Sequence, residues 1–311
     1  MDKTAAMIGS GLIGRAWAMV FARAGWRVRL YDGVEGQVAA ARKLIAASLA
    51  EQQSAGLVDD AAAALDRIAP ASTIEDAVVG AQWVQENLPE ILDLKREVFR
   101  TLDTHASVDA ILASSTSAIP ASRFTESLTG RARCIVAHPV NPPHLVPVVE
   151  LCGAPWTSPE TIARSRAVME EVGQVPVLVR RELDGFILNR LQGALLTEAM
   201  RLVADGYVSA EDLDKTIAHG LGLRWSFMGP FATIELNAPG GVADYCARYS
   251  GFYRRLAAHP ASPDVWHGER AARVAAALGE PLGSAERERR MAWRDARLLA
   301  LARHKRDTPQ P

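Results

Sequence analysis

The chain has 311 residues, 49% of them hydrophobic, and a formal net charge of -1 at pH 7. This length and composition allow a sizeable core and about two domains. A charge so near zero argues against the basic field of a nucleic-acid-binding protein and against an acidic tail. We therefore expect no nucleic-acid partner.

Three widely spaced cysteines and the lack of long apolar runs bear on the compartment. No pair among Cys134, Cys152 and Cys246 has metal-ligand or redox-motif spacing. We therefore expect reduced thiols, no metal site and a cytoplasmic protein. No apolar run approaches the roughly 18 residues of a membrane span, and the first residues lead straight into a strand. We expect neither a membrane span nor a signal peptide.

The first segment reads as a strand, a glycine-rich loop, a helix and a second strand. Residues 4–8 are apolar, helical spacing covers 12–24, and the second strand covers 27–31. The loop is Gly9-Ser10-Gly11-Leu12-Ile13-Gly14, and Asp32 follows the second strand. Such a loop, followed by an acid at the tip of the next strand, is typical of a dinucleotide site. A glycine-rich turn without a ligand is the alternative.

Each part of this loop has a predicted task. Gly9 permits the tight turn, and Gly11 lets the backbone approach a pyrophosphate closely. Gly14 lets the helix pack on the sheet. The amides of Leu12 and Ile13 would bind phosphate at the helix N-terminus. Asp32 would accept hydrogen bonds from the ribose hydroxyls and repel a 2′-phosphate, which favours NAD over NADP.

Strands and helices then alternate. The predicted elements are helices over 35–53, 59–65 and 158–172, and strands from Ile68 on and over 83–87, 110–113 and 176–179. A helix that begins at Pro89-Glu90 carries Lys95. Polar residues collect in Ser114-Ser115-Thr116-Ser117, after the carboxyl end of a strand, where ligands bind in open α/β sheets.

Two apolar runs, 134–137 and 146–150, are joined by a proline-rich turn and read as neighbouring strands. The first leads into His138 and the second ends at Glu150. The strand ends could bring the two side chains together, and an imidazole held by a carboxylate is typical of a general base near neutral pH. A histidine with a purely structural role is the alternative.

After Asp184 no strand pattern remains. Helical patterns cover 185–205, 210–219, 241–259, 263–278 and 285–305. We therefore predict an α/β fold in which residues 1–181 form a Rossmann-type NAD-binding domain. Residues 182–311 would form an all-helical domain for substrate binding and dimerisation.

Several motifs together resemble the 3-hydroxyacyl-CoA dehydrogenase superfamily over almost the whole chain. They are Gly9-x-Gly11-x-x-Gly14, Asp32, Ser115-Thr116-Ser117, His138-Pro139-x-Asn141-Pro142 and Gly185-Phe186-x-x-Asn189-Arg190. Within that superfamily, residues 138–143, 220–230, 236–238 and 293–295 resemble the λ-crystallin branch, whose enzymatic activity is L-gulonate 3-dehydrogenase.

The resemblance implies roles for further residues. Glu90 and Lys95 match a pair that the family places against the nicotinamide end of NAD; without it they read as a helix N-terminal acid and a surface lysine. Ser117 and Asn141 match residues that hydrogen-bond the substrate hydroxyl region or the catalytic histidine. Asn189 matches an asparagine that faces the cleft. The local alternatives are a helix cap for Ser117 and a turn for Asn141.

These parts imply oxidation of a secondary alcohol, with His138 as the base and Glu150 as the group that orients it. Where thioester enzymes of the family read Pro-Met-Gly-Pro, this chain has a longer segment that begins with Arg224. A guanidinium suits a carboxylate, which favours a free hydroxy acid such as L-gulonate. A surface or subunit-interface arginine is the alternative.

Other functions remain open at this point. The rivals are dehydrogenation of L-carnitine or of a short 3-hydroxyacyl-CoA, and a non-catalytic crystallin-like structural protein. A homodimer through the C-terminal domain is expected from the aromatic residues of that domain and from the resemblance. These residues are Trp225, Phe227, Phe231, Tyr245, Tyr249 and Phe252.

Overall fold

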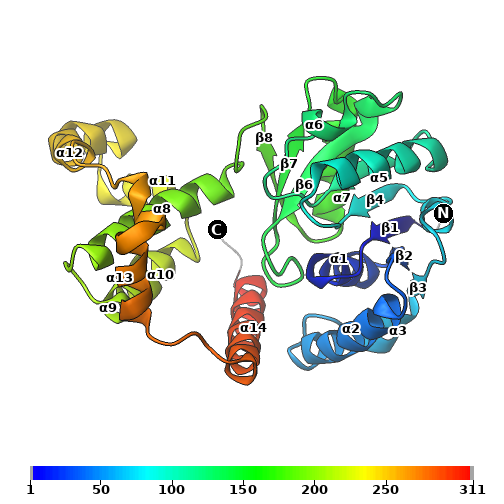
Figure 1. The fold of residues 1–311 in the computed structure, drawn as a ribbon, viewed down its shortest axis with the longest axis horizontal. Helices are drawn as coiled ribbons and strands as arrows, with labels where there is room; N and C mark the ends of the chain where they lie inside the picture. The colour runs from blue at the N-terminus through cyan, green and yellow to red at the C-terminus, as the bar shows by residue number, and fades with distance from the viewer. Residues whose placement is uncertain (1–2, 309–311) are drawn as a thin grey trace. The chain divides into compact units, whose positions relative to one another are not determined.

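The computed structural model describes residues 3–308 (Figure 1). Two compact units are present: one runs to Leu188 and takes up the chain again from Glu288, and the other covers Asn189–Arg287. The first unit holds a single sheet with flanking helices, and the second is helical. The predicted fold class, a Rossmann-type α/β domain followed by a helical domain, is confirmed.

The sheet of the first unit has eight strands in the order β3-β2-β1-β4-β5-β6-β7-β8. Their bounds are β1 (Thr4–Ile8), β2 (Arg27–Tyr31), β3 (Ile68–Pro70), β4 (Trp83–Glu86), β5 (Ile111–Ser114), β6 (Cys134–Pro139), β7 (Val148–Gly153) and β8 (Val175–Val179). All neighbours are parallel except β6 and β7, which are antiparallel. The carboxyl ends of β1, β4, β5 and β6 therefore share one edge of the sheet.

Helices cover both faces of this sheet. They are α1 (Leu12–Arg23), α2 (Gln37–Ser54), α3 (Ala61–Asp66), α4 (Ile74–Val78), α5 (Leu92–His105), α6 (Ser122–Thr125) and α7 (Pro159–Glu171). Most of a further helix, α14 (Ser284–Asp307), belongs to the same unit. Alternate residues of β1 enter two separate cores, because side chains of a strand alternate between its faces. Met7 packs with Trp17 of α1 in one core, and Ile8 packs with Phe99 of α5 in the other.

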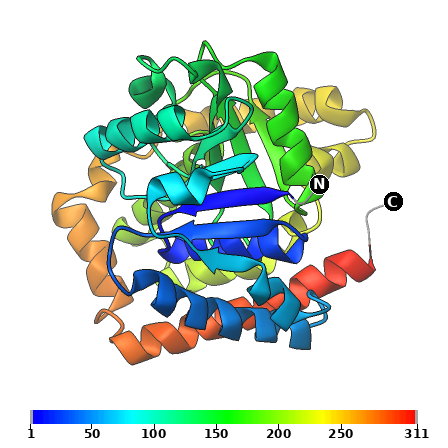
Figure 2. The ribbon, with the colours of Figure 1, turned by 90° about the vertical axis from the view of Figure 1, so that its right-hand side faces the viewer.

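The units divide the chain differently from the predicted domains 1–181 and 182–311. The division falls after Leu188, and most of α14 belongs to the first unit. Leu299 of α14 is buried, and Arg306 donates a hydrogen bond to the carbonyl oxygen of Gly56. Figure 2 shows this helix beside α2. Helical spacing in a sequence does not reveal which core a terminal helix packs against.

The second unit consists of short and medium helices. They are α8 (Leu188–Ala204), α9 (Ala210–Thr216), a π turn (Ile217–Leu221), α10 (Gly222–Trp225), α11 (Pro230–Asn237), α12 (Gly241–Ala257) and α13 (Gly268–Leu278). The predicted helix over 210–219 ends too early, since the chain stays helical to Trp225. A Cβ on Gly222 would lie 2.9 Å from the carbonyl oxygen of Ile217. The glycine permits the wide π turn and does not act as a stop.

A membrane-spanning helix was not expected. Over residues 3–308, every helix is too short or too polar to cross a bilayer.

Candidate active site

The glycine-rich loop follows β1 at the carboxyl edge of the sheet. Gly9 has a φ of 95°, and its N–H donates to the carbonyl oxygen of Tyr31 over 2.8 Å. A Cβ on Gly14 would lie 1.8 Å from the carbonyl oxygen of Gly9, whereas one on Gly11 would meet nothing within 4 Å. Gly14 is therefore required because the helix approaches the backbone of Gly9 in the same loop. The space beside Gly11 is open.

Asp32 follows β2 and holds this loop in place. Its Oδ2 accepts hydrogen bonds from the N–H and hydroxyl of Ser10, at 2.7 and 2.8 Å, and its Oδ1 accepts one from the N–H of Val34 at 3.0 Å. The helix that the loop opens, α1, has no side-chain cap and no acid in its first turn. Open space beside the positive end of a helix dipole fits the phosphates of a dinucleotide.

His138 and Glu150 pair directly across the antiparallel strands β6 and β7. The Nδ1 atom of His138 lies 2.8 Å from Oε2 of Glu150, and both side chains are buried. A carboxylate at this distance holds the proton on Nδ1, which leaves Nε2 as the basic nitrogen. Among residues 3–308, Nε2 has no hydrogen-bond partner. The arrangement is that of a general base.

The turn before α8 fixes the carboxylate. Oε1 of Glu150 accepts hydrogen bonds from the N–H groups of Ile187 and Leu188, at 2.7 and 3.0 Å. Burial would raise the pKa of Glu150, but these bonds and the one from His138 outweigh it, and the pKa is lowered. The ring of Phe186, whose φ is 49°, is fully buried and its centroid is 5.5 Å from that of His138. The sequence motif at these residues gave no hint of this support.

Lys95 is buried rather than a surface lysine. Its Nζ donates to both carboxylate oxygens of Glu86 at 3.0 Å and lies 3.7 Å from Oε2 of Glu90. Glu86, the last residue of β4, also accepts hydrogen bonds from the hydroxyl of Ser114 and the N–H of Leu88, at 2.5 and 2.7 Å. Sequence reasoning missed Glu86; an acid near the carboxyl end of the predicted strand 83–87 was the available signal.

Glu90 lies in the turn before α5, because that helix begins at Leu92 and not at the predicted Pro89-Glu90. The carboxylate accepts hydrogen bonds from the hydroxyl of Thr116 at 2.9 Å, and from the N–H and hydroxyl of Ser117 at 2.5 and 3.1 Å. Burial alone would raise the pKa of Glu90, but the Ser117 N–H and the charge of Lys95 bring it below its ordinary value. The structure thus joins Ser117, Glu90 and Lys95 in one cluster.

A second polar network, not predicted, centres on Ser115. Trp17 and Gln85 donate hydrogen bonds to its hydroxyl oxygen, at 3.1 and 2.7 Å. That hydroxyl donates to the amide oxygen of Asn87 at 2.7 Å. The network links α1 to the ends of β4 and β5, so the helix that opens at the glycine loop is tied to the strands beside it.

Asn141 and His144 lie in the loop between β6 and β7. Asn141 is exposed, and its side chain forms no hydrogen bond to His138 or to any other described residue. His144, a conceivable alternative base, lies with Nε2 3.4 Å from the hydroxyl of Ser48. Burial, followed by the charges of Arg23, Arg15 and Arg294, lowers the pKa of His144 to about 4. An imidazole of such low basicity is a poor proton acceptor.

The two remaining site candidates belong to the second unit. Asn189 is half-buried and stands in the first turn of α8, which begins at Leu188 and not at 185 as predicted. Arg224 is exposed at the end of α10 and lines an apolar hollow of about 360 Å³ with Leu223, Phe227 and Met228. It forms no ion pair or side-chain hydrogen bond with residues 3–308.

Comparisons with known proteins agree with this geometry. Residues 4–183 match the model of the 3-hydroxyacyl-CoA dehydrogenase NAD binding domain, and residues 185–273 match that of its C-terminal domain. The λ-crystallin homolog of Bos taurus is 44% identical over 310 residues, which cover 98% of this chain and 96% of that protein. The L-carnitine dehydrogenase of Pseudomonas putida is 42% identical over 234 residues, 75% of this chain and 72% of that one.

A solved structure is also similar over nearly the full length. It is that of 5-formyl-3-hydroxy-2-methylpyridine 4-carboxylic acid 5-dehydrogenase, an NAD+-dependent dismutase. The two are 30% identical with a TM-score of 0.82, over 97% of this chain and 98% of that one. Both parts of the chain thus match one family of NAD-binding dehydrogenases, and the chain is a member of the 3-hydroxyacyl-CoA dehydrogenase family, within which it is similar to λ-crystallin.

Proposed function

We propose that this protein uses NAD to oxidise the 3-hydroxyl of a free hydroxy acid, and that the substrate is L-gulonate, converted to 3-dehydro-L-gulonate. The observation that carries the proposal is the buried His138–Glu150 pair, 2.8 Å apart, with Nε2 of His138 left as a base. An NAD-binding family supplies the oxidant that such a base requires. A purely structural role would not need an unpartnered imidazole nitrogen at a ligand-binding edge.

The cofactor is assigned to the glycine loop and the residues beside it. Bound NAD supplies a hydride acceptor. The amides of Leu12 and Ile13 bind its phosphates in the space at Gly11, and Asp32 binds the adenosine ribose. Asp32 already holds Ser10, so its replacement by Ala would loosen the loop and the ribose contact together. Comparing kcat/KM for NAD and NADP tests the assignment, and equal values would overturn it.

The chain's own residues perform the proton chemistry. Nε2 of His138 accepts the hydroxyl proton as the carbon–hydrogen bond donates its hydride, and the alcohol becomes a ketone. Glu150 holds the ring and stabilises the imidazolium that forms. Lys95 and Glu90 are assigned to the nicotinamide end of the cofactor. Asn141, Asn189 and Ser117 are assigned to the substrate hydroxyl region.

Arg224 is assigned to the substrate carboxylate. An arginine without an ionic partner beside an apolar hollow is suited to a ligand with a carboxylate head. L-Carnitine is the second candidate, because it too is a free 3-hydroxy acid and a relative that acts on it is 42% identical. NADH formation measured with L-gulonate, L-carnitine and 3-hydroxybutyryl-CoA separates the three readings. Turnover of the thioester alone would refute the free-acid class.

We also propose a homodimer formed by the second unit. Phe231, Tyr249 and Phe252 are exposed, and an apolar hollow of about 530 Å³ lies between α11 and α12. Exposed apolar surface on this scale marks an interaction site. Light scattering of the full chain at micromolar concentration should give twice the monomer mass of 33.6 kDa. A monomer at that concentration contradicts the proposal.

A further inference from the structure

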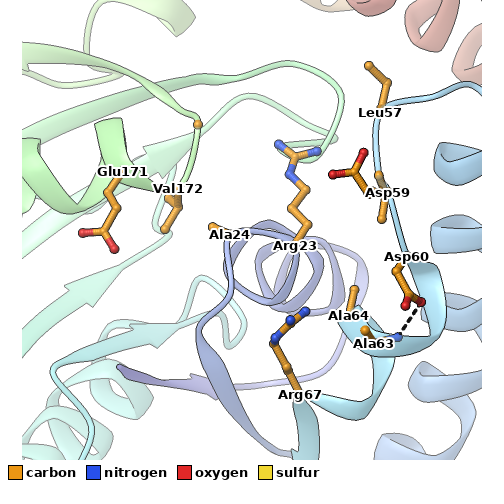
Figure 3. Close-up of a pocket in the computed structure, with 12 residues that line it drawn as sticks. Arg23, Ala24, Leu57, Asp59, Asp60, Ala63, Ala64, Arg67, Glu171 and Val172 are labelled. Carbon is orange, nitrogen blue, oxygen red and sulfur yellow. Dashed lines mark hydrogen bonds between the residues drawn. The ribbon is translucent and has the colours of Figure 1, made fainter. Parts of the chain in front are cut away.

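Two adjoining cavities lie at the C-terminal end of α1, and no residue of the candidate active site lines either of them. The first, of about 390 Å³, is drawn in Figure 3. The second, of about 350 Å³, shares Arg23, Leu57 and Gly173 with the first. Its remaining walls come from residues 144–147, which join β6 to β7, and from α14. Neither cavity is used by the proposed reaction.

The two cavities differ in charge. Carboxylates enter the lining of the first, from Asp59, Asp60 and Glu171. Asp60 caps α3, and Glu171 is paired with Lys3 at 2.6 Å. The second cavity has no acid among its lining residues, which are Arg23, Lys305 and His144 together with Leu57, Leu145, Val146, Pro147, Gly173, Leu298, Leu301 and Ala302. It is therefore a mostly apolar cavity with two cationic side chains, Arg23 and Lys305, in its lining.

Arg23 is the central cation of this cavity. Its Nη1 donates to the carbonyl oxygen of His144 at 2.8 Å and to Oε1 of Gln52 at 3.3 Å. Within residues 3–308, Nε and Nη2 have no acceptor, and no carboxylate forms an ion pair with the side chain. Burial lowers the pKa of Arg23 to about 10. Arg23 is half-buried, and a partly desolvated guanidinium with two unused donor nitrogens favours an anion as its partner.

Arg67 is a second arginine near the end of α1, and Figure 3 shows it in a different position from Arg23. The guanidinium of Arg23 points toward the segment of Leu57 and Asp59, and Arg67 lies on the other side of the end of α1. Arg67 lines the first cavity only. It is a matched control for Arg23, because both are arginines of the same region and only one reaches the second cavity.

His144 is a second polar residue of the same cavity wall. Its Nδ1 is buried and has no hydrogen-bond partner among the described residues. Apart from burial, the groups that lower its pKa are all cations: Arg23, Arg15 and Arg294. Of these cations, Arg294 is paired with Asp295 at 2.7 Å, whereas Arg23 has no ion pair within residues 3–308.

We propose that the second cavity is a binding site for a small organic anion, a carboxylate with a short hydrocarbon chain. The carboxylate accepts hydrogen bonds from Nε and Nη2 of Arg23, with Lys305 as a further cation. The chain packs against Leu57, Leu145, Leu298 and Leu301. A volume of about 350 Å³ is within the range of small-molecule sites. Inorganic phosphate would match the cations but leave the apolar walls unused.

The test is calorimetric titration of the full-length protein with sodium hexanoate. Arg23→Met should weaken binding by about tenfold or more, as expected for loss of charge-assisted hydrogen bonds. Arg67→Met should bind hexanoate as the wild type does. Arg224→Met should leave the Arg23-dependent binding of hexanoate unchanged, which separates this site from the proposed substrate site. Hexan-1-ol and inorganic phosphate should each bind at least about tenfold more weakly than hexanoate.

Two further variants keep the result decisive if Arg23→Met does not fold. Lys305 is exposed and Ala302 is half-buried on α14. Lys305→Met should weaken hexanoate binding, and Ala302→Phe should block it by filling the cavity. The proposal fails if wild type does not bind hexanoate, or if Arg23→Met and Ala302→Phe bind it unchanged. It also fails if only Arg224→Met loses binding, or if phosphate binds as tightly as hexanoate.

Discussion

The edge of the sheet and the helical unit hold their proposed functional side chains in opposite ways. At the sheet edge, His138 and Lys95 are buried and each is fixed by a carboxylate at 2.8 to 3.0 Å. In the helical unit, Arg224 is exposed and has no ionic partner among residues 3–308. The proposed proton-transfer group is therefore fixed in position before a substrate binds, whereas the proposed carboxylate-binding group has no partner in the protein. Preorganisation lowers a reaction barrier, while an open cation supplies affinity.

The largest effect should come from removing the organised base. His138→Ala should lower kcat by about a thousandfold or more, since general-base catalysis contributes up to ~10⁴. NADH affinity, measured by fluorescence titration, should stay the same because no cofactor contact is assigned to His138. A variant that keeps a tenth of wild-type activity would show that another group takes the proton.

The buried ion pair should control stability. Lys95→Met removes the cation from the buried carboxylate of Glu86 and from the exposed carboxylate of Glu90. Breaking such a pair costs about 3–5 kcal/mol of unfolding free energy, measurable by urea denaturation. The exposed pair Lys215–Glu211, 2.7 Å apart, is the control from the helical unit, and Lys215→Met should change stability little.

A double variant sharpens this result. Glu86→Gln combined with Lys95→Met removes both charges of the pair, so it should be more stable than Lys95→Met alone. If the double variant is as unstable as the sum of the single ones, Glu86 and Lys95 do not act as a pair. If Lys95→Met and Lys215→Met behave alike, the contrast between buried and exposed cations has no energetic basis.

The sequence predicted those parts that depend on local pattern. Strands β1 and β2 have the predicted bounds, so the glycine loop and Asp32 lie at their ends as expected. The His138–Glu150 contact follows from the pairing of two strands that are neighbours in the sequence. Lys95 was read locally as a surface lysine, because its partner Glu86 lies on another element. Long-range polar contacts of this kind arise from packing, which periodicity does not encode.

The misjudged helix at Gly220 has a related origin. A glycine is read as a helix stop, but Gly222 serves a close approach to the carbonyl oxygen of Ile217. That approach exists only once the π turn has formed. The place of α14 in the first unit was also not predicted. The pattern of an amphipathic helix does not indicate which core the helix packs against.

Removing only the charge of Glu150 should have a smaller effect than removing His138. In Glu150→Gln, the amide oxygen takes the position that accepts hydrogen bonds from the N–H groups of Ile187 and Leu188. The NH2 group of the amide then faces Nδ1 of His138. Nδ1 must then accept, and the ring proton moves to Nε2, where it blocks the base. We expect a loss of about a hundredfold in kcat. Glu150→Asp should also lower kcat, because the shorter side chain places its carboxylate farther from Nδ1 of His138.

The same variant has a stability signature with a definite sign. The pKa of Glu150 is lowered in the folded protein, so its carboxylate stabilises the fold above its unfolded pKa and this contribution is lost as pH falls through the folded value. The difference in unfolding free energy between wild type and Glu150→Gln should therefore shrink toward acid pH. A difference that grows toward acid pH would mean that the carboxylate is not stabilised as an anion.

The smallest expected effect concerns the unpartnered cation of the helical unit. Arg224→Met should raise KM for the hydroxy acid by about ten- to a hundredfold, which corresponds to the ~1.5–3 kcal/mol of a hydrogen bond to a charged group. NAD affinity should not change, because Asp32 and the helix N-terminus are assigned to the cofactor. The methyl ester of the substrate provides the control. With the wild-type protein, the KM of the ester should exceed that of the acid by about the factor that Arg224→Met adds to the KM of the acid. With Arg224→Met, the KM of the ester should rise little further. An exposed arginine with a structural role would affect acid and ester equally, and that result would leave the helical unit without its proposed part in substrate recognition.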